Sequence, residues 1–246
     1  MATIDVHAEI GTTPMWGVPF TDANLARSMQ KYGVERSIIS STIGNSCDFR
    51  RGNAQIAKVV QSNPSMLGCV VVNMNYPEQS QEEMHAYVGS DQFAALLLTS
   101  GVRGRHVTLT ETEEILNAHR RFVKPVYLHA PNQQAAIAAN EIAKAFSIMK
   151  FVLIWMGGED WRMATLLAER TLNLVLEVSG SSSPDKIQFA SEHIGSHRIV
   201  YGSGLPYVDP SAVIGLVQDA EITDADKRNI LEGSARRLFA WARGPE

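Results

Sequence analysis

The chain has 246 residues, of which 45% are hydrophobic and 20% are charged, and its formal net charge is −4. This length suits one large α/β domain, and the intermixed charges offer no basic surface for a nucleic-acid backbone. Apolar runs such as FVLIWM are far too short to span a membrane, and MATIDVHAEIG lacks the charged and apolar regions of a signal peptide. We therefore expect a cytoplasmic protein that acts on a small molecule and binds neither nucleic acid nor membrane.

Cysteine usage agrees with a reducing compartment. The two cysteines, Cys47 and Cys69, have no CxxC spacing, which argues against a disulfide framework and against a thiolate zinc site. Cys69 lies in the apolar run LGCVVV and is expected to be a buried core thiol. The sequence does not reveal an oligomeric state, so a homo-oligomer stays open.

Apolar segments rich in β-branched residues alternate with segments of helical period along the whole chain. Strands of a parallel sheet that is buried on both faces have this appearance. Eight strands are predicted, at Thr3–Glu9, Arg36–Ser41, Leu67–Asn73, Val102–Thr108, Pro125–Ala130, Phe151–Met156, Leu174–Ser179 and Arg198–Ser203.

Helical segments follow these strands, and several begin with N-capping signals such as Thr21-Asp22. An amphipathic segment from Asp224 to about residue 242 is expected to pack on the outside as a C-terminal helix. The other helices are predicted at Asp22–Tyr32, Asn53–Gln61, Ser80–Val88, Glu111–Phe122, Gln133–Phe146, Trp161–Thr171, Pro184–His193 and Pro210–Asp219.

Eight strand–helix units predict a single (β/α)₈ TIM-barrel domain over residues 1–246. An open, doubly wound sheet would show the same alternation. However, the Gly-rich phosphate loop of a dinucleotide-binding sheet is absent after the first strand.

Polar residues lie at the ends of two predicted strands, where the chemistry of such barrels is located. His7 and Glu9 are two residues apart and so point to the same side of an extended strand, and His129 ends the fifth strand. Two histidines and one carboxylate can hold a catalytic divalent metal. Alternatively, His7 and Glu9 share a hydrogen bond, and His129 is a core histidine bonded to a backbone carbonyl.

The order of motifs resembles a known family. It runs from IDxHxx through a Gly-Val-Glu segment, GVRG, PVxLHA, a strand ending in MGG and YGSxxPY to NILxxxARRLF. This order is similar to the amidohydrolase-related superfamily, in the branch called amidohydrolase 2. The resemblance implies a (β/α)₈ barrel that hydrolyses amides or lactones, or decarboxylates aromatic acids, usually with one divalent metal.

The resemblance also implies a degenerate metal site. The family's first-strand His-x-His is His7-Ala8-Glu9 here, and its fifth-strand histidine is matched by His129. Trp155 stands where the family has a histidine, and Gly204 stands where it has the aspartate that serves as general base. His7, Glu9 and His129 would then hold one zinc or manganese ion weakly or not at all, and Trp155 would pack in the barrel or form an aromatic wall for a ligand.

Three further residues are candidates for the site. Arg103 and Arg105 share a face of the predicted fourth strand, where a guanidinium can clamp a substrate carboxylate; an outward, surface-paired arginine is the alternative. A GVRG strand also resembles the lactonase branch of the superfamily. Glu177, inside the seventh strand, is a candidate for the missing base or for a structural hydrogen bond.

These residues predict a hydrolase that acts on a lactone or amide of a small carboxylated substrate, with His129 and Glu177 as catalytic groups. Water would attack a polarised carbonyl, with or without a metal. Two alternatives stay open: a catalytically inactive barrel that binds a small molecule or a partner protein, and a metal-dependent decarboxylase.

Overall fold

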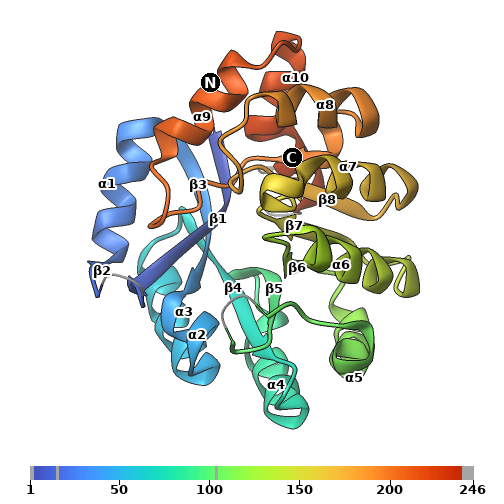
Figure 1. Ribbon diagram of the computed structural model, residues 1–246. Helices are drawn as coiled ribbons and strands as arrows, with labels where there is room; N and C mark the ends of the chain where they lie inside the picture. The colour runs from blue at the N-terminus through green and yellow to red at the C-terminus, as the bar shows by residue number, and fades with distance from the viewer. Residues whose placement is uncertain (1–2, 15–16, 103–104, 240–246) are drawn as a thin grey trace.

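Parallel strands surround a common centre, and helices cover their outer side (Figure 1). The computed structural model describes residues 3–14, 17–102 and 105–239. Within these residues one sheet has the order β2-β1-β3-β4-β5-β6-β7-β8-β9, and every pair is parallel except β1 with the short β2. The strands are β1 Thr3–Thr12, β2 Pro19–Phe20, β3 Val34–Ser41, β4 Met66–Asn73, β5 Phe93–Thr99, β6 Val126–His129, β7 Phe151–Ile154, β8 Leu174–Glu177 and β9 Ile199–Val200.

Backbone hydrogen bonds between β1 and the segment after β9 close the sheet into a barrel. The Gly204 amide donates to the His7 carbonyl at 3.0 Å, and the Glu9 amide donates to the Leu205 carbonyl at 2.8 Å. Closure removes the two sheet edges, and the predicted (β/α)₈ TIM barrel is thereby confirmed.

Several helices begin at a residue whose side chain caps the first turn. Thr21 and Asn24 form a capping box at the start of the first helix, and the Asp209 side chain caps the helix that begins with Pro210. The α-helices are α1 Asp22–Tyr32, α2 Thr42–Ser46, α3 Phe49–Ser62, α4 Pro77–Glu83, α5 Leu109–His119, α6 Gln133–Ala145, α7 Trp161–Arg170, α8 Asp185–Ile194, α9 Pro210–Asp219, α10 Asp224–Arg228 and α11 Ser234–Leu238; shorter helical turns are η1 Met84–Val88, η2 Arg120–Phe122, η3 Gly158–Asp160, η4 Ser196–Arg198 and η5 Asn229–Gly233.

The predicted fourth strand, Val102–Thr108, is wrong. The fourth parallel strand is β5, whose residues Phe93–Leu98 are buried. A barrel strand must bury both faces, and the run FAALLLT does so, whereas Val102 is 57% exposed and residues 105–108 have no regular structure. Arg105 therefore lies in the loop after β5 and not on a strand.

Alternate strand residues fill the inside of the barrel, and their neighbours pack against the helices. Cys69 belongs to the inner set, which confirms the expected buried thiol. The inner set from the strands is Ile4, Val6, Ile38, Leu67, Cys69, Val71, Ala94, Ala95, Leu97, Tyr127, Val152, Ile154, Val175 and Val200.

The C-terminal segment does more than pack on the outside. Ile230 and Leu231 join the outer apolar cluster, but Ala235 and Phe239 join the inner one. Leu238 lies beside Lys124 and Lys150, which precede β6 and β7, so the segment closes the N-terminal end of the barrel. The helical part ends at Leu238, and residues 240–242 of the predicted helix lie outside the described residues.

None of the helices in the described ranges combines the length and the apolar character that crossing a bilayer requires.

Replacing Phe239, whose ring packs inside the N-terminal end of the barrel, should destabilise the whole barrel. Phe239 is 1% exposed and packs edge-on against Tyr127 at a ring-centroid distance of 6.4 Å. We expect Phe239→Ala to lower the free energy of unfolding in urea by about 3–5 kcal/mol, because truncation leaves a cavity. The exposed Leu172→Ala is the control, with an expected change within about 0.5 kcal/mol. Equal effects of the two variants would contradict this packing role of Phe239.

Candidate active site

An irregularity in β1 aims its polar residues at the mouth of the barrel. The register of β1 against β3 shifts between Asp5 and Ala8. Ile4 belongs to the inner cluster, whereas Ala8 belongs to the outer one. A bulge of this kind re-aims side chains. His7 and Glu9 thus share the inward side, as their spacing predicted.

Below the mouth, the Asp5 carboxylate ties three strands together. Its Oδ1 accepts hydrogen bonds from the amides of His7 (3.0 Å) and Ser203 (2.8 Å), and its Oδ2 accepts from the hydroxyls of Ser203 (2.7 Å) and Ser37 (3.4 Å). Burial raises the pKa of Asp5 to about 6, and the hydrogen bonds from Ser203 and His7 oppose this rise.

His7 is paired with Glu177 within the barrel. The Nδ1 atom of His7 lies 3.3 Å from Oε2 of Glu177, and both side chains are buried. Burial alone would lower the pKa of His7, but the hydrogen bond and charge of Glu177, with the charges of Glu9 and Asp5, outweigh it and raise the pKa. Of the open alternatives for His7, the structure places a carboxylate pair here, with Glu177 as the partner instead of Glu9.

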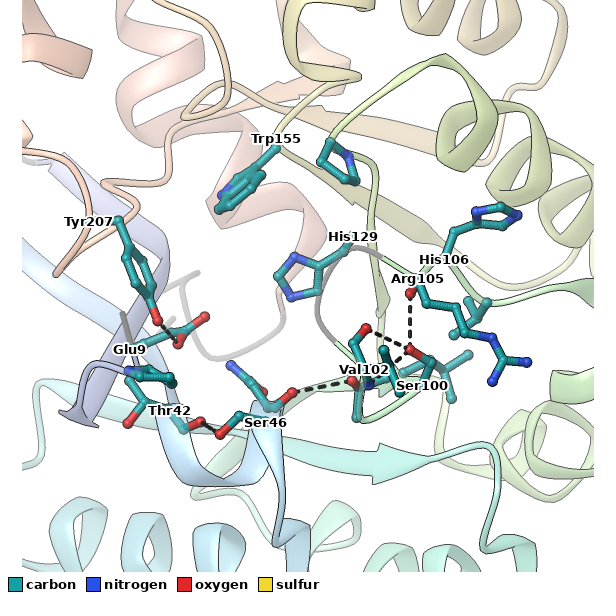
Figure 2. A pocket seen from close by; sticks show the side chains of 16 residues that line it. Glu9, Thr42, Ser46, Ser100, Val102, Arg105, His106, His129, Trp155 and Tyr207 are labelled. Carbon is teal, nitrogen blue, oxygen red and sulfur yellow. Dashed lines mark hydrogen bonds between the residues drawn. The ribbon is translucent and has the colours of Figure 1, made fainter. Parts of the chain in front are cut away.

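A pocket of about 280 Å³ opens above this pair at the C-terminal ends of the strands. Figure 2 shows Glu9, Tyr207, Trp155 and His129 around one opening. It is lined by Glu9, Pro14, Thr42, Asn45, Ser46, Leu98, Thr99, Ser100, Val102, Arg105, His106, Val107, His129, Pro131, Trp155 and Tyr207.

The floor of the pocket places a histidine between two rings. The rings of His7 and His129 meet edge-on at a centroid distance of 6.1 Å, and those of His129 and Trp155 do so at 5.9 Å. Tyr207 donates its hydroxyl to Oε2 of Glu9 at 3.3 Å. The arrangement brings an imidazole and a buried carboxylate to one small cavity with an aromatic wall.

The arginines are placed less centrally. Arg103 lies outside the described residues. Arg105 lines the rim, but its guanidinium pairs with Glu111, and its side chain extends away from His129 (Figure 2). Ser100 holds this rim by donating its hydroxyl to the carbonyls of Val102 and Arg105, each at 3.0 Å.

The donor set does not fit the divalent metal that the family resemblance implies. Among the residues that the structure describes, no three His, Cys, Asp or Glu side chains are arranged to hold a metal ion. His7, Glu9 and His129 therefore do not form a ligand set in the structure. Nδ1 of His7 faces Glu177, and the Glu9 carboxylate accepts from Tyr207.

The backbone conformation at Gly204 disfavours the aspartate that the family resemblance implies at this position. Its φ of +67° lies in the left-handed region, and a Cβ there would stand 3.1 Å from the Cβ of Ser179. An aspartate at this position would be strained, because left-handed backbone favours glycine.

Several site residues escaped the sequence reasoning. Tyr207 was visible only as part of the motif YGSGLPY, and Asn45 and Ser46 lie on the short helix α2, which the sequence did not predict. Asp5 carried one usable signal: an acid in a strand that is otherwise apolar must find buried donors.

Comparisons with known proteins agree with this barrel. Residues 13–241 match the amidohydrolase family, and the chain belongs to this family. The match indicates an enzyme of the amidohydrolase superfamily. A comparison with curated protein sequences finds no match.

Solved structures of similar fold include two decarboxylases and a hydratase. The 2,6-dihydroxybenzoate decarboxylase from Rhizobium is 16% identical with a TM-score of 0.79, over 96% of this chain and 98% of that one. A dihydroxybenzoic acid decarboxylase from Polaromonas, with bound manganese and the inhibitor 2-nitroresorcinol, is 16% identical with a TM-score of 0.78 over 96% of each chain. The 4-oxalomesaconate hydratase from Rhodopseudomonas palustris is 18% identical with a TM-score of 0.72, over 97% and 95%. At sequence identities this low, the structural similarity establishes the shared fold alone.

The buried acid should make stability depend on pH. A raised carboxyl pKa means that the native state binds more protons than the unfolded state between pH 3.8 and about 6. The contribution of Asp5 is therefore complete below pH 3.8 and is lost as the pH rises through about 6, by about 3 kcal/mol. In Asp5→Asn, an amide can keep these contacts because the hydroxyls of Ser37 and Ser203 can accept.

We expect Asp5→Asn to be more stable than the wild type at pH 7, with the difference vanishing near pH 4. Urea unfolding at several pH values measures this, and the other carboxylates cancel in the difference. A difference that is independent of pH would contradict the assignment.

The donor set also predicts weak metal binding. Protein purified without chelator should contain far less than one manganese or zinc ion per chain, and calorimetric titration with either ion should show no saturable site. The reason is that no three candidate ligands are grouped around one point in the described part of the chain. One tightly held ion per chain would show that these side chains rearrange around metal.

Proposed function

We propose that this chain is a hydrolase that opens a lactone or amide bond of a small carboxylated substrate, with His129 as general base and without a tightly held metal. The observation that carries the proposal is the meeting of His129 and Glu9 at one pocket beside the ring of Trp155. An enclosed site that combines apolar walls with a few ionisable groups is the usual form of a small-molecule active site.

The chemistry needs one residue that takes a proton and returns it. His129 removes a proton from water, whose oxygen forms a bond to the substrate carbonyl carbon. The ring C–O or C–N bond then breaks, and the imidazolium of His129 returns the proton to the leaving oxygen or nitrogen. The Glu9 carboxylate, oriented by the Tyr207 hydroxyl, favours the imidazolium at the same pocket.

The substrate carboxylate is assigned to the rim, at Arg105 and His106. Arg105 is 46% exposed and pairs with Glu111, which is 30% exposed. An ion pair this accessible to water contributes only about 0–1 kcal/mol, so a substrate carboxylate can replace Glu111 at small cost. A guanidinium can then bind both carboxylate oxygens.

Decarboxylation is the second candidate, favoured by the flat wall that Trp155 presents and by the similar structures that decarboxylate dihydroxybenzoates. An aromatic acid would stack or meet edge-on with this ring. An inactive barrel is the third outcome, and ligand binding without turnover would identify it.

A substrate panel separates these candidates. Carboxylated lactones, amides and 2,6-dihydroxybenzoate are incubated with the enzyme, with and without chelator, and chromatography and CO₂ release are followed. We expect ring opening that survives chelation. CO₂ release would favour decarboxylation, and a thermal shift by a panel compound without any product would leave only binding.

His129→Gln should reduce the turnover of whichever substrate is found by roughly 10²–10⁴-fold, because proton transfer by a positioned group contributes about that much. The matched control is His197→Gln, at an exposed histidine in η4. Full activity of His129→Gln would show that another group is the base.

A further inference from the structure

Glu177 is completely buried beneath the pocket and does not line it. Its Oε2 accepts from the Trp155 amide at 3.1 Å and from the Ser179 hydroxyl at 2.8 Å, and lies 3.3 Å from Nδ1 of His7. Its Oε1 accepts from the Ser179 amide at 2.7 Å. A carboxylate so enclosed cannot touch a substrate, so any role in the reaction must pass through its partners.

Two of those partners carry the rings that flank His129. The His7 ring meets the His129 ring at an interplanar angle of 78°, and the Trp155 ring meets it from another side at 88°. One carboxylate therefore holds the side chain of one neighbour and the backbone of the other.

The backbone at Trp155 needs such a hold. Its φ is +71° and that of Met156 is +48°, both in the left-handed region, which is unfavourable for bulky residues. The Trp155 amide is fixed by Glu177, and its carbonyl accepts from the Gly158 amide at 2.7 Å. The turn that presents the indole to the pocket is thus anchored through both backbone polar groups of Trp155.

Two glycines make room for this arrangement. A Cβ at Gly180 would lie 2.0 Å from the Trp155 carbonyl oxygen. A Cβ at Gly202 would lie 2.4 Å from Oε1 of Glu177 and 2.8 Å from the Cβ of His7. A side chain at Gly180 would displace the Trp155 backbone, and one at Gly202 would displace Glu177 or His7.

We infer that Glu177 is a positioning residue that orients His129 through His7 and Trp155. The inference rests on the proposed function only for its effect on turnover, since the ring geometry exists without a substrate. The charge and the acceptor geometry both matter, because the groups that face Glu177 include the amide donors of Trp155 and Ser179. A glutamine would direct its NH₂ at some of these donors or at His7.

The test is Glu177→Gln, with Glu159→Gln as the matched control at an exposed acid of the same mouth. The tryptophan emission assigned to Trp155 by comparison with Trp155→Phe, and the imidazole ¹⁵N signals assigned to His129 by comparison with His129→Gln, should both shift in Glu177→Gln and stay unchanged in the control. Far-UV circular dichroism should stay at the wild-type spectrum.

With a substrate in hand, we expect kcat to fall roughly 10- to 100-fold in Glu177→Gln while KM changes little, because misplacement affects the reacting geometry more than binding. Unshifted His129 and Trp155 signals would overturn the inference. Shifted signals with unchanged kcat would support the positioning and overturn the role of His129 as base.

Should Glu177→Gln not fold, Ser179→Ala removes one of the Glu177 contacts and serves as the second variant. It should shift the same two signals in the same direction by a smaller amount. Absence of any shift in a folded Ser179→Ala variant would likewise count against the positioning role of Glu177.

Discussion

Burying negative charge inside the barrel is the constraint on which the rest of this structure depends. Asp5 on β1 and Glu177 on β8 are shielded from bulk solvent almost completely. A buried carboxylate is tolerated only when donors surround it. Donors for Asp5 come from Ser203 after β9, and donors for Glu177 include the Trp155 amide after β7. These contacts satisfy the acids and also connect the ends of different strands.

The hydrogen bonds of these buried acids determine which polar groups the mouth of the barrel presents. Because Glu177 engages Nδ1 of His7, that imidazole is part of the internal hydrogen-bond network. Trp155 brings an aromatic surface to the pocket, and Gly204 provides a left-handed turn. Membership in the amidohydrolase family thus coexists, among the described residues, with a mouth in which no three candidate metal ligands are grouped.

The two ends of the barrel divide the tasks of stability and chemistry. At the N-terminal end, Phe239 and Ala235 complete the apolar interior. At the other end the interior becomes polar from His7 outward, and the pocket begins there. This separation lets loops such as the one held by Ser100 vary the rim while the apolar interior keeps the strands in place.

The sequence by itself determined the barrel, because period-two and period-3.6 patterns of apolar residues decide which segments are strands and helices before any long-range contact is known. It also located His7, Glu9 and His129 at strand ends. It misplaced the fourth strand at Val102–Thr108, whereas the segment that buries both faces in the barrel is FAALLLT.

Only the tertiary structure decided which partner each polar residue has. His7 and Glu177 are 170 residues apart in the chain, and no local pattern reports a pair formed across the closure of a barrel. The same holds for Glu9 with Tyr207. Strand order and register bring these groups together, and burial then decides that they must satisfy one another, so the identity of the site is a property of the closed barrel.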